Sequence, residues 1–197
     1  MWNKFPSIQS LLIECLELII EKTAIENKEI EKTVTDLIVS QGKLLRPAYF
    51  LLFSRLGTAA QGAHKKIIAA AASTEVLHLA TLIHDDIIDE AKMRRGVETV
   101  QSKHGKDVAV YAGDLLISVY FDLLADATDS VEIIKLNTLS MKQVLLGEIN
   151  QMTNAYNTEI TYEDYLKSIK GKTAQLFELI CYEGAYFGGC SPEVIEQ

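Results

Sequence analysis

The chain has little of what interrupts a helix: its 197 residues include only three prolines and eleven glycines. Proline removes a backbone donor and glycine loosens the backbone, so a low content of both favours long helices over many short strands and turns. Basic charge is also scarce, because the net charge is −8 and the isoelectric point is about 5.0. This balance argues against a nucleic-acid-binding protein, which presents a basic surface to its ligand.

Cysteines and targeting signals are equally few. The three cysteines, Cys15, Cys181 and Cys190, are odd in number and lack the spacing of a metal or redox site. They are typical of buried thiols in a reducing compartment. The chain shows no basic start followed by an apolar run and a cleavage site. No window approaches the roughly 20 apolar residues of a membrane span. We therefore expect a cytoplasmic protein without a transmembrane segment.

What the chain does contain is apolar residues at helical spacing. Its hydrophobic fraction is 48%, enough for one domain with a substantial core. Apolar positions three and four apart predict helices, which we place at 7–23, 28–39, 47–56, 64–89, 107–125, 130–152, 162–168 and 172–187, with another starting at Pro192. No segment alternates with β-branched enrichment, so we expect essentially no sheet. The predicted fold is all-α, a single helical domain over residues 1–197.

The predicted helix at 64–89 is apolar nearly all round, which is typical of a helix buried inside a larger bundle. It ends in His84-Asp85-Asp86-Ile87-Ile88-Asp89. Residues four apart overlie one another, so Asp85 and Asp89 share a face and Asp86 lies one step round. Three neighbouring carboxylates repel one another unless a cation neutralises them. Their oxygen atoms suit Mg²⁺, although a solvated helix end would carry the same pattern.

Two adjacent arginines follow this acidic cluster. Arg94-Arg95-Gly96 begins five residues after Asp89, and paired guanidinium groups suit two anionic groups. Acids, a short loop and paired arginines together indicate one diphosphate site, in which metal ions and cationic side chains bind the same oxygens.

With these motifs the sequence resembles the trans-prenyl diphosphate synthase (polyprenyl synthetase) family over almost the whole chain. The stretch 77–89 followed by 94–96 is similar to the family's first aspartate-rich motif. Gly42-Lys43-Leu44-Leu45-Arg46-Pro47 resembles its basic motif for isopentenyl diphosphate. Three further motifs follow in the family's order: Gly113-Asp114, Gly147-Glu148 with Gln151, and Gly171-Lys172-Thr173-Ala174. The resemblance implies an isoprenoid-synthase-type helical bundle, here without its carboxyl-terminal helices.

The resemblance also implies a role for each matching position. Three aspartates would hold Mg²⁺ against the diphosphate of the allylic substrate: Asp85, Asp86 and Asp89. Three residues would contact that same diphosphate: Arg94, Lys172 and Thr173. Four would bind the diphosphate of isopentenyl diphosphate: Lys43, Arg46, His78 and Arg95. The catalytic residues would be the three aspartates with Arg94 and Lys172, whereas Glu148 and Gln151 receive no catalytic role.

Taken singly, several of these residues have simpler interpretations. Lys43 and Arg46 would suit a solvated cationic loop, and His78 would suit a packed helix. Lys172-Thr173 would suit the start of a helix after Gly171.

In an enzyme of this family the allylic carbon–oxygen bond breaks, the double bond of isopentenyl diphosphate attacks the allylic cation, and a proton is lost. The growing product would extend from Asp85 along the preceding helix, where Leu77, Ala80 and Thr81 lie. Short-chain relatives have aromatic residues near these positions, and many bacterial ones carry a two-residue insertion in the acid motif. Small residues without an insertion indicate a long-chain synthase of the hexaprenyl or heptaprenyl class, which makes quinone side chains.

The family's second aspartate-rich motif, which follows the lysine-threonine segment, is missing from the 197 residues. We therefore expect the amino-terminal part of a longer synthase, inactive or nearly so by itself. Alternatives are a subunit of a heteromeric synthase and a synthase of shorter products, geranylgeranyl or farnesyl diphosphate. A terpene cyclase would not need Lys43, Arg46 and His78, and the ordered motifs argue against a purely structural helical module. The resemblance implies a homodimer or a heterodimer.

Overall fold

The computed structural model describes residues 1–40, 42–59, 62–153 and 157–196, except the side chains of Ser168, Lys172 and Thr173. Most of these residues are helical, which confirms the predicted all-α fold. The first elements are η1 Trp2–Lys4, α1 Pro6–Lys22, α2 Lys28–Ser40, α3 Leu45–Ser54 and α4 His64–Ile88. A hairpin of β1 Met93–Arg94 and β2 Val97–Glu98 follows. The remaining helices are α5 Val100–His104, α6 Lys106–Ala127, α7 Val131–Thr153, α8 Tyr162–Ile169, η2 Lys170–Ala174, α9 Gln175–Phe187 and α10 Pro192–Ile195.

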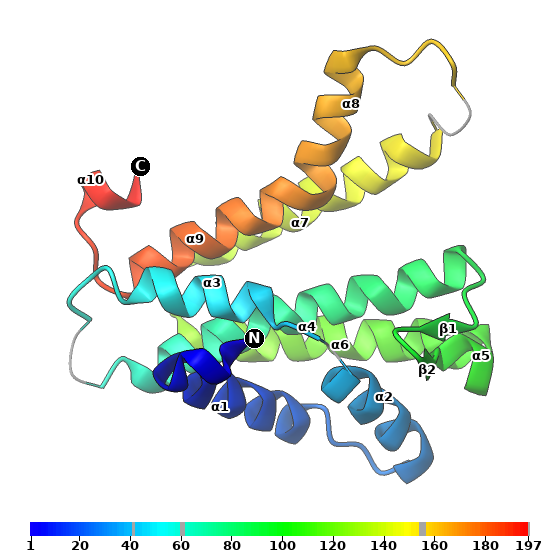
Figure 1. Ribbon diagram of the computed structural model, residues 1–197, viewed down its shortest axis with the longest axis horizontal. Coiled ribbons are helices and arrows are strands. Elements are labelled where there is room, and N and C mark those ends of the chain that lie inside the picture. Colours follow the sequence, from blue (N-terminus) through cyan, green and yellow to red (C-terminus); the bar gives the residue numbers. More distant parts are fainter. Residues whose placement is uncertain (41, 60–61, 154–156, 197) are drawn as a thin grey trace.

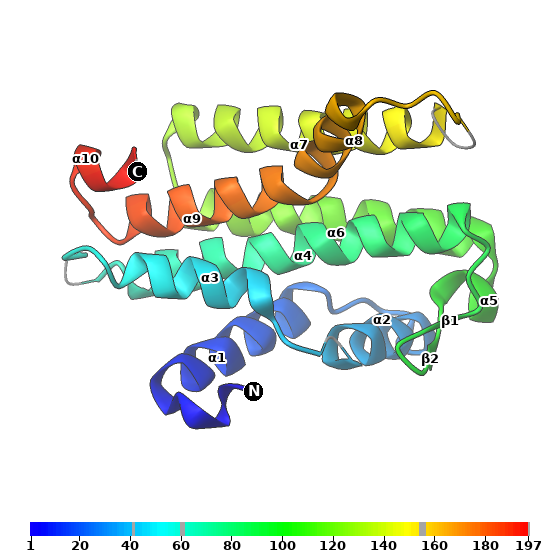
Figure 2. The same ribbon diagram turned by 45° about the horizontal axis from the view of Figure 1, so that its top comes forward.

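The long helices lie in three layers (Figures 1 and 2). One outer layer contains α1 and α2, the middle layer contains α3, α4 and α6, and the other outer layer contains α7 and α9. The most extensive packing is between α4 and α6, and α3 packs along α9. The helix α4 is therefore covered on several sides, as its apolar sequence predicts. Four consecutive alanines at 69–72 are each at most 4% exposed, so neighbouring helices approach this part of α4 closely.

The helices α4 and α6 are also long and apolar enough, by length and composition, to cross a membrane. This finding corrects the expectation that no window comes near that threshold. A buried core helix meets the same criteria, and 78% of the α4 window and 44% of the α6 window lie inside the structure. Because the two helices pack on each other at the centre of the bundle, we interpret them as core helices.

Among the described residues, one short hairpin is the only departure from the expected all-α fold, which was predicted to contain essentially no sheet. Met93 pairs with Glu98 and Arg94 with Val97 in antiparallel register. The two residues between the strands, Arg95 and Gly96, have φ values of +52° and +85°, the left-handed conformations that tight hairpin turns require. Strands of two residues are too short to give an alternating pattern, so the sequence carried no signal for them.

The segment 170–174 differs from the prediction of a helix starting at Lys172. It forms a single turn of π-helix that joins α8 to α9 without a break. Gly171 lies within this turn and does not end a helix. Its lack of a side chain allows close packing on α7, since a Cβ atom on it would lie 3.2 Å from the Cα atom of Gly147. Single π turns within helices are frequent at functional sites.

Candidate active site

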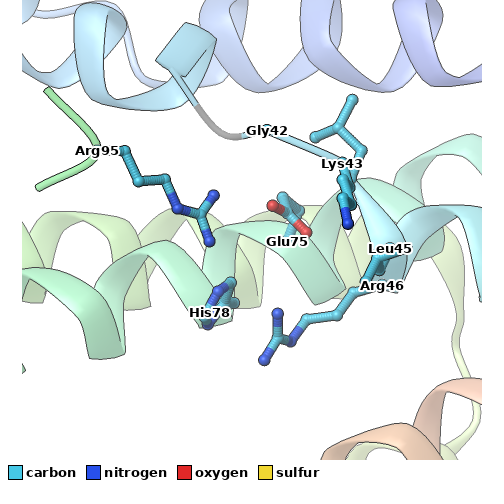
Figure 3. A pocket seen from close by; sticks show the side chains of 8 residues that line it. Gly42, Lys43, Leu45, Arg46, Glu75, His78 and Arg95 are labelled. Carbon is cyan, nitrogen blue, oxygen red and sulfur yellow. The ribbon is translucent and has the colours of Figure 1, made fainter. Parts of the chain in front are cut away.

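A cationic cavity of about 380 Å³ opens between the α2–α3 connection, α4 and the hairpin (Figure 3). Its lining residues are Gly42, Lys43, Leu44, Leu45, Arg46, Glu75, His78 and Arg95. They come from three separate parts of the sequence. The structure therefore brings together all four residues that the sequence assigned to isopentenyl diphosphate: Lys43, Arg46, His78 and Arg95.

The connection before α3 is held in a sharply turned conformation. Leu44 has a φ of +46°, a left-handed conformation that is costly for a residue other than glycine. The indole Nε1 of Trp2 donates a hydrogen bond of 2.5 Å to the carbonyl oxygen of Lys43. This turn allows both Lys43 and Arg46 to line the same cavity, although Lys43 itself is largely exposed.

Arg46 is the most deeply placed cation of the cavity. Its guanidinium carbon lies 5.5 Å from the ring centre of Phe177 on α9, a cation–π contact that orients the side chain. Burial lowers the pKa of Arg46 from its ordinary value. Its Nε atom is buried and finds no hydrogen-bond partner among the described residues. A buried donor without an acceptor is costly, so an anion in the cavity would stabilise it.

His78 lies on α4 in the same cavity and is electrically neutral. Burial, together with the positive charges of Arg46, Arg95 and Arg94, lowers the pKa of its imidazole to about 3. The side chain therefore offers an anion a hydrogen bond rather than a charge.

A second cavity of about 270 Å³ runs along the same face of α4 towards Asp85. It is lined mainly by apolar side chains from four helices, together with Asp85, His84 and Glu148. All three residues that the sequence proposed for control of chain length line it: Leu77, Ala80 and Thr81. Arg46 and His78 line both cavities. The cationic cavity and the apolar cavity are therefore contiguous.

The three aspartates of the predicted metal site do not converge in this structure. The side chain of Asp86 is only 4% exposed and is held by Arg94, whose Nη2 lies 2.7 Å from its Oδ1. This bond raises the pKa of the Arg94 guanidinium. Among the residues that the structure describes, no three histidine, cysteine or acidic side chains are placed to hold one metal ion. Asp85 in the last turn of α4 and Asp89 directly after this helix remain one turn apart, a pair of carboxylates that suits a hard cation such as Mg²⁺.

The motif Gly113-Asp114 lies beside His84, the residue before Asp85. A Cβ atom on Gly113 would lie 2.3 Å from Nε2 of His84, so the absence of a side chain makes room for the imidazole. Asp114 Oδ1 lies 3.4 Å from the same nitrogen. Through these contacts α6 positions the residue that directly precedes Asp85.

Two predicted site residues are described by their backbone alone. Lys172 and Thr173 lie in the π turn, and their side chains lie outside what the structure describes. Glu148, which received no catalytic role, lines the apolar cavity, and Gln151 is exposed on α7.

Sequence reasoning missed Glu75, a buried acid in the cationic cavity. A signal was present, because Glu75 precedes His78 by three residues and therefore shares its face of α4. An acidic residue within the apolar stretch of a central helix is rare unless it has a function or a partner.

The chain is similar to known prenyl diphosphate synthases. Residues 27–197 match the family model described as Polyprenyl synthetase. The chain is 35% identical over 178 residues to solanesyl-diphosphate synthase 2, chloroplastic, from Oryza sativa subsp. japonica, over 87% of this chain and 43% of that protein. It is 30% identical to heptaprenyl diphosphate synthase component 2 from Bacillus subtilis, over 97% of this chain and 55% of that protein.

A solved structure shares the same fold. The geranylgeranyl pyrophosphate synthase from Lactobacillus brevis superposes with a TM-score of 0.94 at 41% identity, over 99% of this chain and 60% of that chain. This similarity confirms the predicted helical bundle of the isoprenoid-synthase type. The chain spans about half the length of the curated relatives it matches.

Proposed function

Because this chain belongs to the polyprenyl synthetase family, we propose that it carries part of the active site of an Mg²⁺-dependent prenyltransferase. The enzyme would condense isopentenyl diphosphate with an allylic diphosphate. The observation that carries the proposal is the contiguity of the two cavities through Arg46 and His78. A diphosphate in the cationic cavity would lie next to a hydrocarbon chain in the apolar one, which is the arrangement that a condensation of these two substrates requires.

Isopentenyl diphosphate would bind in the cationic cavity. Lys43, Arg46 and Arg95 supply positive charge, and neutral His78 supplies a hydrogen bond. The buried Nε atom of Arg46 would gain the acceptor that it lacks among the described residues.

The allylic diphosphate would bind at the other end of this face, near Asp85 and Asp89. His78 and Asp85 are seven residues apart, which is about 10 Å along a helix. When bound there, Mg²⁺ would neutralise the charge that develops on the departing diphosphate. Asp86 would reach an ion only after Arg94 releases it, and Arg94 would then be available to the diphosphate. Lys172 and Thr173 remain proposed contacts of the same group.

The hydrocarbon part of the allylic substrate would occupy the apolar cavity. Side chains such as Leu82, Ile117 and Leu176 line it, and they would exclude the water that would otherwise quench an allylic cation. The growing chain would contact three residues of α4 that precede Asp85 and line the same cavity: Leu77, Ala80 and Thr81.

We propose a long-chain product of the hexaprenyl or heptaprenyl class, because no aromatic side chain lines the described part of the apolar cavity. We also propose that the enzyme is cytoplasmic. The name of the heptaprenyl relative supports this product class, and the name of the solanesyl relative supports a long chain in general. A geranylgeranyl product is the second candidate, since the solved structure at 41% identity carries that name. The term component 2 in the name of the Bacillus subtilis relative likewise favours a heteromeric assembly over a homodimer.

The test is an incorporation assay on the full-length gene product. Labelled isopentenyl diphosphate is supplied with geranyl, farnesyl or geranylgeranyl diphosphate, with Mg²⁺ or with excess chelator, and the products are separated by chain length. We expect Mg²⁺-dependent products longer than geranylgeranyl diphosphate. No incorporation with any primer by a folded protein, even after addition of a candidate second subunit, would contradict the proposal. We expect the 197 residues alone to be inactive, because they contain only one aspartate-rich motif.

A further inference from the structure

A buried carboxyl group lies within the cationic cavity. Glu75 is 3% exposed, and it lines the cavity together with Lys43, Arg46, His78 and Arg95. Its Oε2 atom is buried and has no hydrogen-bond partner among the described residues. Figure 3 shows Arg95 and Arg46 extending from opposite sides towards the space around Glu75 and His78. An acid at this place is unexpected, because an ionised carboxylate repels the anion that the cavity is built to bind.

The groups around Glu75 come from several elements. Arg46 from α3 and Arg95 from the hairpin bring positive charge, and both lower the pKa of Glu75, but burial outweighs them and raises it to about 7. On α4 itself His78 is neutral. From α1 the thiol of Cys15 is also neutral, because burial first, and then the charges of Glu14 and Glu75, raise its pKa to about 12.

Before a ligand binds, an ionised Glu75 would stabilise the two arginines of the cavity. Arg46 and Arg95 repel each other, as the lowering of the Arg46 pKa by Arg95 indicates. A carboxylate among them offsets this repulsion and keeps both guanidinium groups at the cavity. Once a diphosphate is bound, the arginines have another anion as partner and the carboxylate is no longer needed as a negative charge.

We propose that Glu75 is a positioning residue that takes up a proton when a diphosphate enters the cationic cavity. In the empty cavity its carboxylate holds Arg46 and Arg95 in place. On binding, a proton from solvent neutralises the carboxylate, so that one carboxylate and one proton become one carboxylic acid. The protonated group no longer repels the ligand, and its O–H can donate a hydrogen bond towards a phosphate oxygen. This inference rests on the proposed function, since it takes the cavity to be the site of a diphosphate.

Proton uptake changes how binding depends on pH. Above about pH 7 the free protein must gain a proton to bind, so affinity falls with rising pH by up to about tenfold per unit. Below that range Glu75 is already protonated and contributes no further dependence. The diphosphate ligand titrates as well, and therefore only the difference between wild type and a Glu75 variant reports on this residue.

The experiment measures the number of protons taken up on binding. Isopentenyl diphosphate, without an allylic primer, is titrated calorimetrically into the full-length gene product at pH 7.5 in buffers of different ionisation enthalpy. We expect the wild type to take up more protons on binding than Glu75→Gln, with a difference of at most one proton per site. Glu183→Gln is the matched control, because Glu183 is also buried with a pKa raised to about 7 but does not line the cavity. That variant should keep the wild-type proton count.

A second variant guards against misfolding of the first, and the presence of any heat of binding tests the cavity itself. Glu75→Asp retains a carboxyl group and should retain proton uptake, which keeps the test usable if Glu75→Gln does not fold. Equal proton counts for wild type and Glu75→Gln would overturn the role of Glu75 alone. Absence of any binding of isopentenyl diphosphate to wild type would instead overturn the proposed function of the cavity.

Discussion

Arg94 binds the carboxylate of Asp86 through two of its nitrogen atoms. Its Nε lies 2.9 Å from Oδ1 and 3.0 Å from Oδ2, and its Nη2 lies 2.7 Å from Oδ1. Arg94 belongs to the hairpin and Asp86 to the last turn of α4. The pair therefore fastens the hairpin, and with it Arg95, to the end of the central helix.

Replacing Arg94 should destabilise the fold as well as the site. The side chains of Asp86 and Arg94 are only 4% and 24% exposed, so Arg94→Ala leaves a buried carboxylate without its partner. We expect the free energy of unfolding to fall by about 3 kcal/mol, measured by urea denaturation. Arg55→Ala is the control, because Arg55 donates to Ser7 at the surface and should cost about 1 kcal/mol or less. Equal losses for the two variants would show that the Asp86 pair carries no special weight.

A bulky side chain at position 80 should shorten the product. Ala80 is fully buried and lines the apolar cavity, so the ring of Ala80→Phe would occupy space along the path proposed for the growing chain. Products of the full-length enzyme are compared by chromatography after reaction with the same primer. Ala80→Ser adds almost no volume and should leave the length unchanged. Thr81→Phe, at a partly exposed position of the same cavity, repeats the test if overpacking unfolds Ala80→Phe. An unchanged length in both phenylalanine variants would refute this account of the cavity.

The stability of the fold should depend on pH through Glu183. This residue accepts a hydrogen bond from Asn137 Nδ2, and the hydroxyl of Tyr120 donates to Asn137 Oδ1 at 2.7 Å. Burial raises the pKa of Glu183 from 4.5 to about 7, so the folded state binds more protons than the unfolded state between these values. The free energy of unfolding therefore falls as pH rises towards 7 and is constant above it, with a slope of at most about 1.4 kcal/mol per pH unit.

The variant Glu183→Gln isolates this contribution. It resembles the protonated side chain, so it should match wild type at low pH and be more stable than wild type at pH 8. Urea denaturation of both proteins across this range gives the comparison. Parallel curves for the two proteins would mean that Glu183 has an ordinary pKa.

A glycine in α9 should respond to alanine with the opposite sign from ordinary helix propensity. Within a helix, alanine is favoured over glycine by about 1 kcal/mol. A Cβ atom on Gly184, however, would lie 2.5 Å from the carbonyl oxygen of Phe50 and 2.9 Å from the Cβ atom of Phe53. We expect Gly184→Ala to lower the melting temperature because the backbone of α3 cannot move aside. At Gly113 the three atoms nearest to an added Cβ all belong to the side chain of His84, so Gly113→Ala should cost less. A higher melting temperature for Gly184→Ala would disprove close packing of α3 on α9.

Much of the fold follows from helical periodicity. The prediction of a helix at 64–89 agrees closely with α4 His64–Ile88, because a long apolar pattern leaves no other way to bury its side chains. The family resemblance also implied that residues near 43, 78 and 95 belong together, and the structure places them around one cavity.

Other features depend on geometry that the sequence does not display. The hairpin rests on two residue pairs and two positive φ values, and the π turn at 170–174 lies in close contact with α7 through Gly171. Asp86 differs from Asp85 and Asp89 because one step along a helix turns a side chain by about 100°. That rotation predicts a separate face, but the partner on that face, Arg94, is known only from the structure.

The most direct test of the two-cavity account is a comparison of two variants in steady-state kinetics of the full-length enzyme. Arg95 lines only the cationic cavity and Asp85 only the apolar one. We predict that Arg95→Gln raises KM for isopentenyl diphosphate by about tenfold, the loss expected of one charged hydrogen bond, with little change in KM for the allylic diphosphate. Asp85→Asn should instead lower kcat and weaken binding of the allylic diphosphate. If both variants changed the two KM values by equal factors, the assignment of one substrate to each cavity would be wrong.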